Sequence, residues 1–143
     1  MVGGNQSRAM PRAQIATSIA PLAPSEVGYI NAHGSSTPLN DTTETLAIKR
    51  VFGEHAHRLA VSGTKGYYGH PLGASGAIEA AICALGMARD WLPPTINLET
   101  PDPACDLNYL ANNGNQRAPE YVVSNSFGFC GVNAVVVLRR HEN

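Results

Sequence analysis

Two histidines, His33 and His70, stand in short motifs of small and polar residues and are the first candidates for chemistry in this sequence. Imidazole serves acid–base and hydrogen-bond chemistry near neutral pH. Each motif follows a run typical of a β-strand, residues 27–31 and 59–62, so both histidines are expected on loops at strand carboxyl ends. We interpret the motifs, NAHGSSTP at 31–38 and TKGYYGH at 64–70, as two halves of one active site without an obvious nucleophile.

A helix is expected between the two motifs. Pro38 favours a helix start, and the helix should reach about residue 52. Asp41 and Glu44 fall in its first turns, where the helix dipole favours negative charge, and Gly53 ends it. The later segments are an extended linker at 93–109, a turn-rich loop at 112–115, and two strands at 121–126 and 133–139 joined by a glycine-rich connection.

A second helix is expected over residues 72–91. Its only charge before Arg89 is Glu79, so it is apolar nearly all round and should be buried. A membrane span is the competing interpretation. Three glycines and Glu79 make insertion costly, and the uninterrupted apolar stretch is too short, so we favour a core helix.

Composition indicates a globular chain with no nucleic-acid partner. It has 143 residues, 43% hydrophobic and 15% charged, with a net charge of -1, which fits one domain. Three cysteines without paired or metal-like spacing favour free thiols in a reducing compartment, and no metal, nucleotide or redox cofactor is expected. The remaining histidines are expected to be solvated: His55, His57 and His141.

The first 26 residues are expected to be an irregular segment before a domain at 27–143. Two arginines, three serines and no acidic residue before Glu26 resemble a transit peptide. The alternative is a ragged or wrongly assigned start, because prolines break any long amphipathic helix there. No apolar core of a secretory signal is present.

Five motifs occur in the order found in β-ketoacyl-acyl-carrier-protein synthases of the fatty-acid elongating type, which this sequence resembles over residues 27–139. The motifs are NAHGSSTP at 31–38, TK at 64–65 with GH at 69–70, LGASGA at 72–77, PPTIN at 93–97 and NSFGF at 125–129. The pair of histidines resembles the elongating enzymes rather than the initiating type, which has a histidine and an asparagine.

The resemblance implies an α/β, thiolase-like fold of two halves, each with a mixed five-stranded sheet and flanking helices, and this chain looks like the C-terminal half. The family's nucleophilic cysteine lies in the other half. Family enzymes load that cysteine with an acyl group, decarboxylate malonyl-carrier protein, and join the resulting carbanion to the acyl thioester. The implied partners are acyl carrier protein with its phosphopantetheine, the N-terminal ketosynthase half and a second copy, in the cytoplasm or else a plastid or mitochondrion.

The resemblance also implies roles for individual residues. His33 and His70 would stabilise the enolate oxygen formed on decarboxylation. Lys65 and Glu79 match a pair thought to hold the loop that carries His70, the alternative being a solvated lysine and a stray helix charge. The other matches are Ser35 and Thr37 for the pantetheine arm, Phe129 for the gate and oxyanion hole, and Asp41, Glu44 and Asn133 for support. Helix capping and surface solvation are the alternative for these three supporting residues.

Some positions depart from the family pattern. Residues 66–68, GYY, replace a serine-methionine or serine-asparagine stretch, Pro71 replaces a leucine, and Cys130 stands where the family has glycine. Cys130 is not expected to be a substitute nucleophile, because it lies in a strand connection without the helix N-terminus that activates the family cysteine. Cys83 is expected in the core, and Cys105 is expected to be a loop thiol.

These observations predict an acyltransferase half-domain for fatty-acid condensation that is inactive on its own. The first alternative is a non-catalytic ketosynthase-like partner, comparable to chain-length factors, or a degenerate fragment. The second is a small thioester hydrolase that uses Cys130. Because the second helix is apolar, the chain on its own is expected to self-associate.

Overall fold

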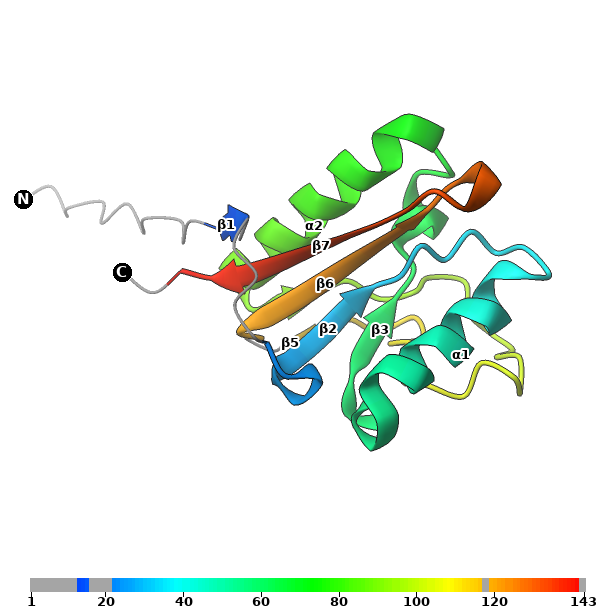
Figure 1. Ribbon diagram of the computed structural model, residues 1–143, viewed down its shortest axis with the longest axis horizontal. Helices are drawn as coiled ribbons and strands as arrows, with labels where there is room; N and C mark the ends of the chain where they lie inside the picture. The colour runs from blue at the N-terminus through cyan, green and yellow to red at the C-terminus, as the bar shows by residue number, and fades with distance from the viewer. Residues whose placement is uncertain (1–12, 16–21, 117–118, 142–143) are drawn as a thin grey trace, which may run out of the picture.

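The computed structural model describes residues 13–15, 22–116 and 119–141 and shows a sheet flanked by helices (Figure 1). The two helices are α1 (Asn40–Phe52) and α2 (Ser75–Arg89). The strands are β1 (Ala13–Ile15), β2 (Val27–Asn31), β3 (Ala60–Ser62), β4 (Trp91–Leu92), β5 (Asn115–Gln116), β6 (Tyr121–Phe127) and β7 (Asn133–Arg140). Short 3-10 turns lie at 24–26, 53–58, 64–67, 72–74 and 129–131.

The main sheet has five strands in the order β1-β7-β6-β2-β3. β2 runs parallel to both β3 and β6, whereas β6 and β7 form an antiparallel hairpin and β1 pairs antiparallel with β7. The expected mixed five-stranded sheet is therefore confirmed. Parallel pairing brings the carboxyl ends of β2, β3 and β6 to one edge, where the loops that follow them meet.

The two helices cover opposite faces of this sheet, because successive strand residues point to opposite sides. Ile30 and its neighbours on β3 and β6 pack with Ile48 of α1 in one buried cluster. Tyr29, one residue earlier, packs with Cys83 and Met87 of α2 in the other. The sheet that carries the histidine loops at one edge therefore has α1 packed on one face and α2 on the other (Figure 1).

The expectation that the second helix is buried on all sides is wrong for this chain. By length and composition residues 72–89 are apolar enough to cross a membrane, with a mean hydropathy of 1.2, yet only 28% of that window is buried. α2 packs one face on the sheet and leaves Ile78 and Leu85 exposed at 36% and 43%. Glu79 lies in the packed face and is fully buried. A sheet packs against one face of a helix, so among the described residues nothing covers the outward-facing apolar side chains of α2.

Three further expectations differ from the structure. The N-terminal segment contains β1, which joins the main sheet. β4, at the end of the expected helix over 72–91, pairs with β5, at the end of the expected loop, in a separate two-stranded sheet. His55 is half-buried rather than solvated, since its Nε2 lies 2.8 Å from the Val27 carbonyl oxygen. The transit-peptide interpretation concerns residues that lie mostly outside the described part of the chain, the exceptions being 13–15 and 22–25.

Candidate active site

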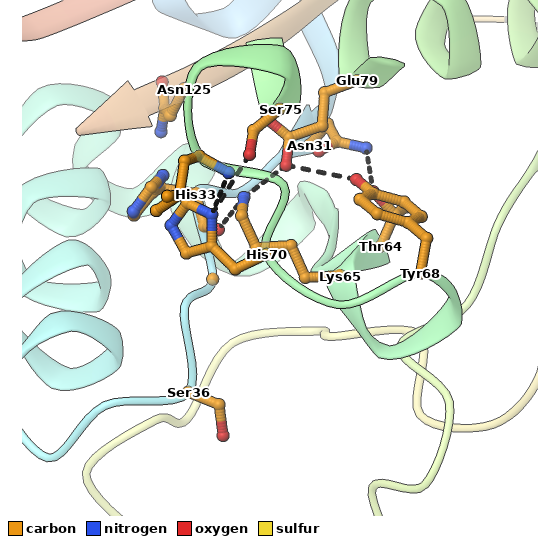
Figure 2. Close-up of polar contacts among 12 residues, drawn as sticks. Asn31, His33, Ser36, Thr64, Lys65, Tyr68, His70, Ser75, Glu79 and Asn125 are labelled. Atoms are coloured by element: carbon orange, nitrogen blue, oxygen red, sulfur yellow. Dashed lines mark hydrogen bonds and ion pairs between the residues drawn. The ribbon is translucent and has the colours of Figure 1, made fainter. Parts of the chain in front are cut away.

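The two histidine loops lie side by side at the edge of the sheet. His33 follows β2 by two residues, and His70 follows β3 after the 3-10 turn at 64–67. Their ring centroids are 5.3 Å apart, with the planes at 74°. Phe127, the last residue of β6, places its ring 5.5 Å from that of His33. The three rings thus come from β2, β3 and β6 or from the loops that follow them, and they lie close to one another at the sheet edge. Figure 2 shows the two histidines.

Small residues allow the two loops to approach. A Cβ atom at Gly34 would lie 3.2 Å from the Gly63 Cα, and Gly34 has a φ of +47°, in the left-handed region. Glycine tolerates that region without steric cost, while its missing side chain leaves room for the neighbouring backbone. The glycine after His33 is therefore required for the contact between the β2 and β3 loops.

Glu44 clamps the His33 loop from the first turns of α1. Its Oε1 accepts hydrogen bonds from the His33 backbone N–H at 2.9 Å and the Asn125 side chain at 3.0 Å. Its Oε2 accepts from the Gly34 N–H at 3.0 Å. Glu44 is only 4% exposed, so the alternative that this carboxylate is solvated at the surface is wrong. Asn125 was not selected by sequence reasoning, although it opens the NSFGF motif.

Asp41 supports the same loop nearer the surface. Its Oδ1 accepts hydrogen bonds from the Ser36 N–H at 3.1 Å and the Asn40 side chain at 3.0 Å. Ser36 has a φ of 57°, a left-handed conformation that few residues other than glycine adopt readily. The carboxylate thus stabilises a tight bend between β2 and α1, a role different from simple surface solvation.

Lys65 and Glu79 form a buried ion pair that ties the two histidine loops together. The Lys65 Nζ contacts Glu79 Oε1, and the residues are 7% and 0% exposed. The same Nζ donates to the backbone carbonyl of His33 at 2.5 Å. The lysine is therefore not solvated, and it acts on the loop of His33 as well as on the segment leading to His70 (Figure 2).

The surroundings of each histidine control its protons. The His70 Nδ1 accepts a hydrogen bond from the Leu72 N–H at 3.2 Å and lies 3.2 Å from the Ser75 hydroxyl. A neutral His70 therefore carries its proton on Nε2. For His33, burial first and the Lys65 charge second lower the pKa, so its ring is neutral near pH 7. The neutral His33 ring can then donate one N–H without carrying charge, and the His70 Nε2 is the ring nitrogen left free to donate.

The expected pantetheine and gate residues lie farther out. The Ser35 and Thr37 hydroxyls are 3.2 Å apart, and Thr37 also accepts from the Asn40 N–H at 3.2 Å. Thr37 lines a cavity of about 560 Å³ together with α1 and the 95–105 segment, whereas Ser35 does not. Phe129 is 91% exposed at the tip of the β6–β7 hairpin, and Asn133 pairs with Phe127 at its base.

The three cysteines differ sharply in environment. Cys83 is buried on α2, and burial together with the nearby Glu79 carboxylate raises its pKa to about 12. Cys105 is half-buried and lines the cavity. Cys130 is exposed next to Phe129 with a φ of 61°, in a turn of three residues rather than at a helix N-terminus. The structure therefore gives Cys130 no helix dipole that would activate its thiol.

The architecture matches solved ketosynthases and is a thiolase-like half-domain. A type II polyketide ketosynthase in complex with its acyl-carrier protein (AntDE:AntF) aligns with a TM-score of 0.83 and 42% identity, over 85% of this chain and 30% of that one. The ishigamide ketosynthase/chain length factor aligns with a TM-score of 0.79 and 35% identity, over 83% and 29%.

Sequence comparison identifies the family. The model of the beta-ketoacyl synthase C-terminal domain matches residues 3–99. The 3-oxoacyl-[acyl-carrier-protein] synthase 2 of Synechocystis sp. is 50% identical over 121 residues, which are 85% of this chain and 29% of that protein. The chain therefore belongs to the β-ketoacyl synthase family and corresponds to its C-terminal domain. It spans 29% of the length of this curated relative.

Proposed function

We propose that this chain is the histidine-bearing part of a fatty-acid condensing enzyme. In this role it serves decarboxylative Claisen condensation of malonyl-carrier protein with an acyl thioester. The single observation that carries the proposal is the pair of imidazole rings, 5.3 Å apart, held by an ion pair and a carboxylate clamp at one sheet edge. The similarity to the Synechocystis relative, a 3-oxoacyl-[acyl-carrier-protein] synthase, supports the same chemistry.

The chemistry follows from two donors facing one oxygen. Decarboxylation breaks the bond between the malonyl carboxylate and the α-carbon, and the electron pair moves onto the thioester oxygen to form an enolate. An N–H from His33 and one from His70 stabilise that oxygen, each donor being worth about 3 kcal/mol in a dry site. The enolate carbon then attacks the acyl thioester carbon and expels a thiolate.

The remaining parts of the reaction are assigned to partners. The acylated cysteine belongs to an N-terminal ketosynthase half, and the uncovered apolar face of α2 is the surface on which that half packs. Acyl carrier protein brings both substrates on phosphopantetheine, with Ser35 and Thr37 as hydrogen-bonding groups for the arm and Phe129 as the gate. The solved complex of a related ketosynthase with its carrier protein supports this choice of partner. A homodimer in the cytoplasm completes the proposal.

A non-catalytic role is the second candidate. The likeness to the ishigamide ketosynthase/chain length factor favours it, since that assembly pairs a ketosynthase with a chain length factor. In this role the chain associates with an active synthase, and its histidines contribute nothing to turnover.

A chimera separates the two roles. Residues 27–140 of this chain replace the matching C-terminal part of the Synechocystis relative, and malonyl-carrier decarboxylation and 3-ketoacyl formation are measured. We expect an active chimera that loses at least a hundredfold in rate with His33→Ala or His70→Ala, while His57→Ala, an exposed histidine outside the site, is the matched control. A folded but inactive chimera favours the non-catalytic role, and activity that survives both site substitutions contradicts the assignment.

A further inference from the structure

Tyr68, which follows directly after the 3-10 turn at 64–67, joins the buried ion pair. Its hydroxyl donates to Glu79 Oε1 at 3.3 Å and lies 3.0 Å from the Thr64 hydroxyl. Glu79 Oε1 thus receives Tyr68 and Lys65 together (Figure 2). The adjacent Tyr67 is 50% exposed and is not part of this network of described residues.

The hydrogen bonds of this network run in one direction. A phenol has one proton, and Tyr68 gives it to Glu79, so the Tyr68 oxygen accepts from the Thr64 hydroxyl. The Thr64 oxygen in turn accepts from the Asn31 amide at 3.4 Å. Every donor along the chain therefore points toward the Glu79 carboxylate. Such a chain of aligned hydrogen bonds favours a single orientation of its acceptor.

The network begins and ends next to the histidine loops. Asn31 is the last residue of β2, two residues before His33, while Tyr68 precedes His70 by two. Burial raises the pKa of Tyr68, so its phenol keeps the proton that it donates throughout the neutral range. The Tyr68 hydroxyl therefore belongs to a hydrogen-bond network that connects the His33 loop with the His70 loop.

We propose that Tyr68 is a positioning residue of this site: its hydroxyl orients the Glu79 carboxylate so that Lys65 holds the His33 carbonyl. The inference rests on the proposed function for its effect on rate, and on the contacts alone for its effect on structure. Tyr68 acts through Glu79 and Lys65 and does not touch substrate. Loss of the hydroxyl therefore lowers turnover without weakening substrate binding.

Activity in the chimera tests the first effect. With Tyr68→Phe we expect kcat for malonyl-carrier decarboxylation to fall about tenfold, the size of a lost hydrogen bond to a charged group, with KM unchanged. Tyr67→Phe, which removes the neighbouring hydroxyl, leaves kcat unchanged. In a background with Lys65→Met and Glu79→Leu, Tyr68→Phe should cost nothing further, since the carboxylate and the ammonium through which the hydroxyl acts are already gone. Equal kcat values for Tyr68→Phe and Tyr67→Phe would overturn the proposal.

A measurement on the 143-residue chain tests the second effect without any activity. In 1H–15N spectra, Tyr68→Phe should shift the Lys65 ammonium and the His33 backbone amide, whereas Tyr67→Phe should leave both in place. Unmoved signals in Tyr68→Phe overturn the inference whatever the chimera does. An inactive wild-type chimera whose chain still shows the shifts contradicts the proposed function and leaves the positioning role standing.

Discussion

Replacing Glu79 with leucine in the 143-residue chain should lower the free energy of unfolding by about 3–5 kcal/mol. The carboxylate is fully buried, and its partner Lys65 is 7% exposed. Removal of one member leaves the ammonium inside with only the His33 carbonyl as acceptor, a loss of the size measured for broken buried pairs. The ceiling is the cost of taking the proton from an ordinary lysine at pH 7, about 5 kcal/mol.

Urea unfolding followed by circular dichroism measures this cost, and a double variant separates its causes. Lys65→Met with Glu79→Leu removes both charges and fills the space with apolar groups, so stability should return to within about 1 kcal/mol of wild type or exceed it. The matched control is the exposed pair Arg139–Glu120, 3.2 Å apart and more than half exposed on each side. Glu120→Gln should cost under about 1 kcal/mol.

The reasoning fails in two ways that these data can show. A cost below about 1 kcal/mol for Glu79→Leu means that water reaches the pair and that its burial carries no penalty. A double variant as unstable as the single one means that the loss comes from packing rather than from an unpaired charge. If Glu79→Leu alone does not fold, recovery of a cooperative transition in the double variant still decides between these causes.

Three other outcomes are expected. The His33 pKa lies below the ordinary 6.5. Stability should therefore fall as the pH drops from 6.5 to the lowered pKa, because only the unfolded chain binds the proton in that range, and should then level off. His33→Asn should remove this slope of stability against pH in urea titrations. Gly34→Ala should lower the unfolding free energy by about 1–3 kcal/mol, since φ is +47° and the new Cβ meets the Gly63 backbone, and a calorimetric melt unchanged by it would sink that argument. Iodoacetamide should label exposed Cys130 in the native chain but Cys83 only after unfolding, because burial raises its pKa to about 12, as mass spectrometry of digests can show.

Local patterns were sufficient for the elements that carry the histidines. The bounds of β2 match the expected strand at 27–31, and the glycine-rich connection forms the predicted β6–β7 hairpin. Parallel strands then place the two loops at one edge by geometry alone, since consecutive carboxyl ends meet there. Strand order and loop position are thus enough to predict that His33 and His70 lie close together.

The hydrogen-bond partners of the site could not be predicted from such local patterns. Glu44 was assigned only a supporting role that competed with solvation, yet it receives two backbone N–H groups and the Asn125 amide. Whether a carboxylate in a helix's first turns faces solvent or folds back on its own loop depends on where the helix begins. α1 begins at Asn40, two residues after the expected Pro38, which places Glu44 closer to the helix N-terminus and to the His33 loop.

The burial of α2 shows what a hydropathy pattern measures. The pattern correctly marks an apolar helix, but it cannot say which surface supplies each contact. In this chain one face packs on the sheet around Cys83 and Met87, while Ile78 and Leu85 face outward. A helix that packs on one sheet needs only one apolar face. A helix with two apolar faces therefore indicates packing against a second layer on its other side. That excess of apolar surface is the reason for the proposal that α2 packs between this sheet and a second half.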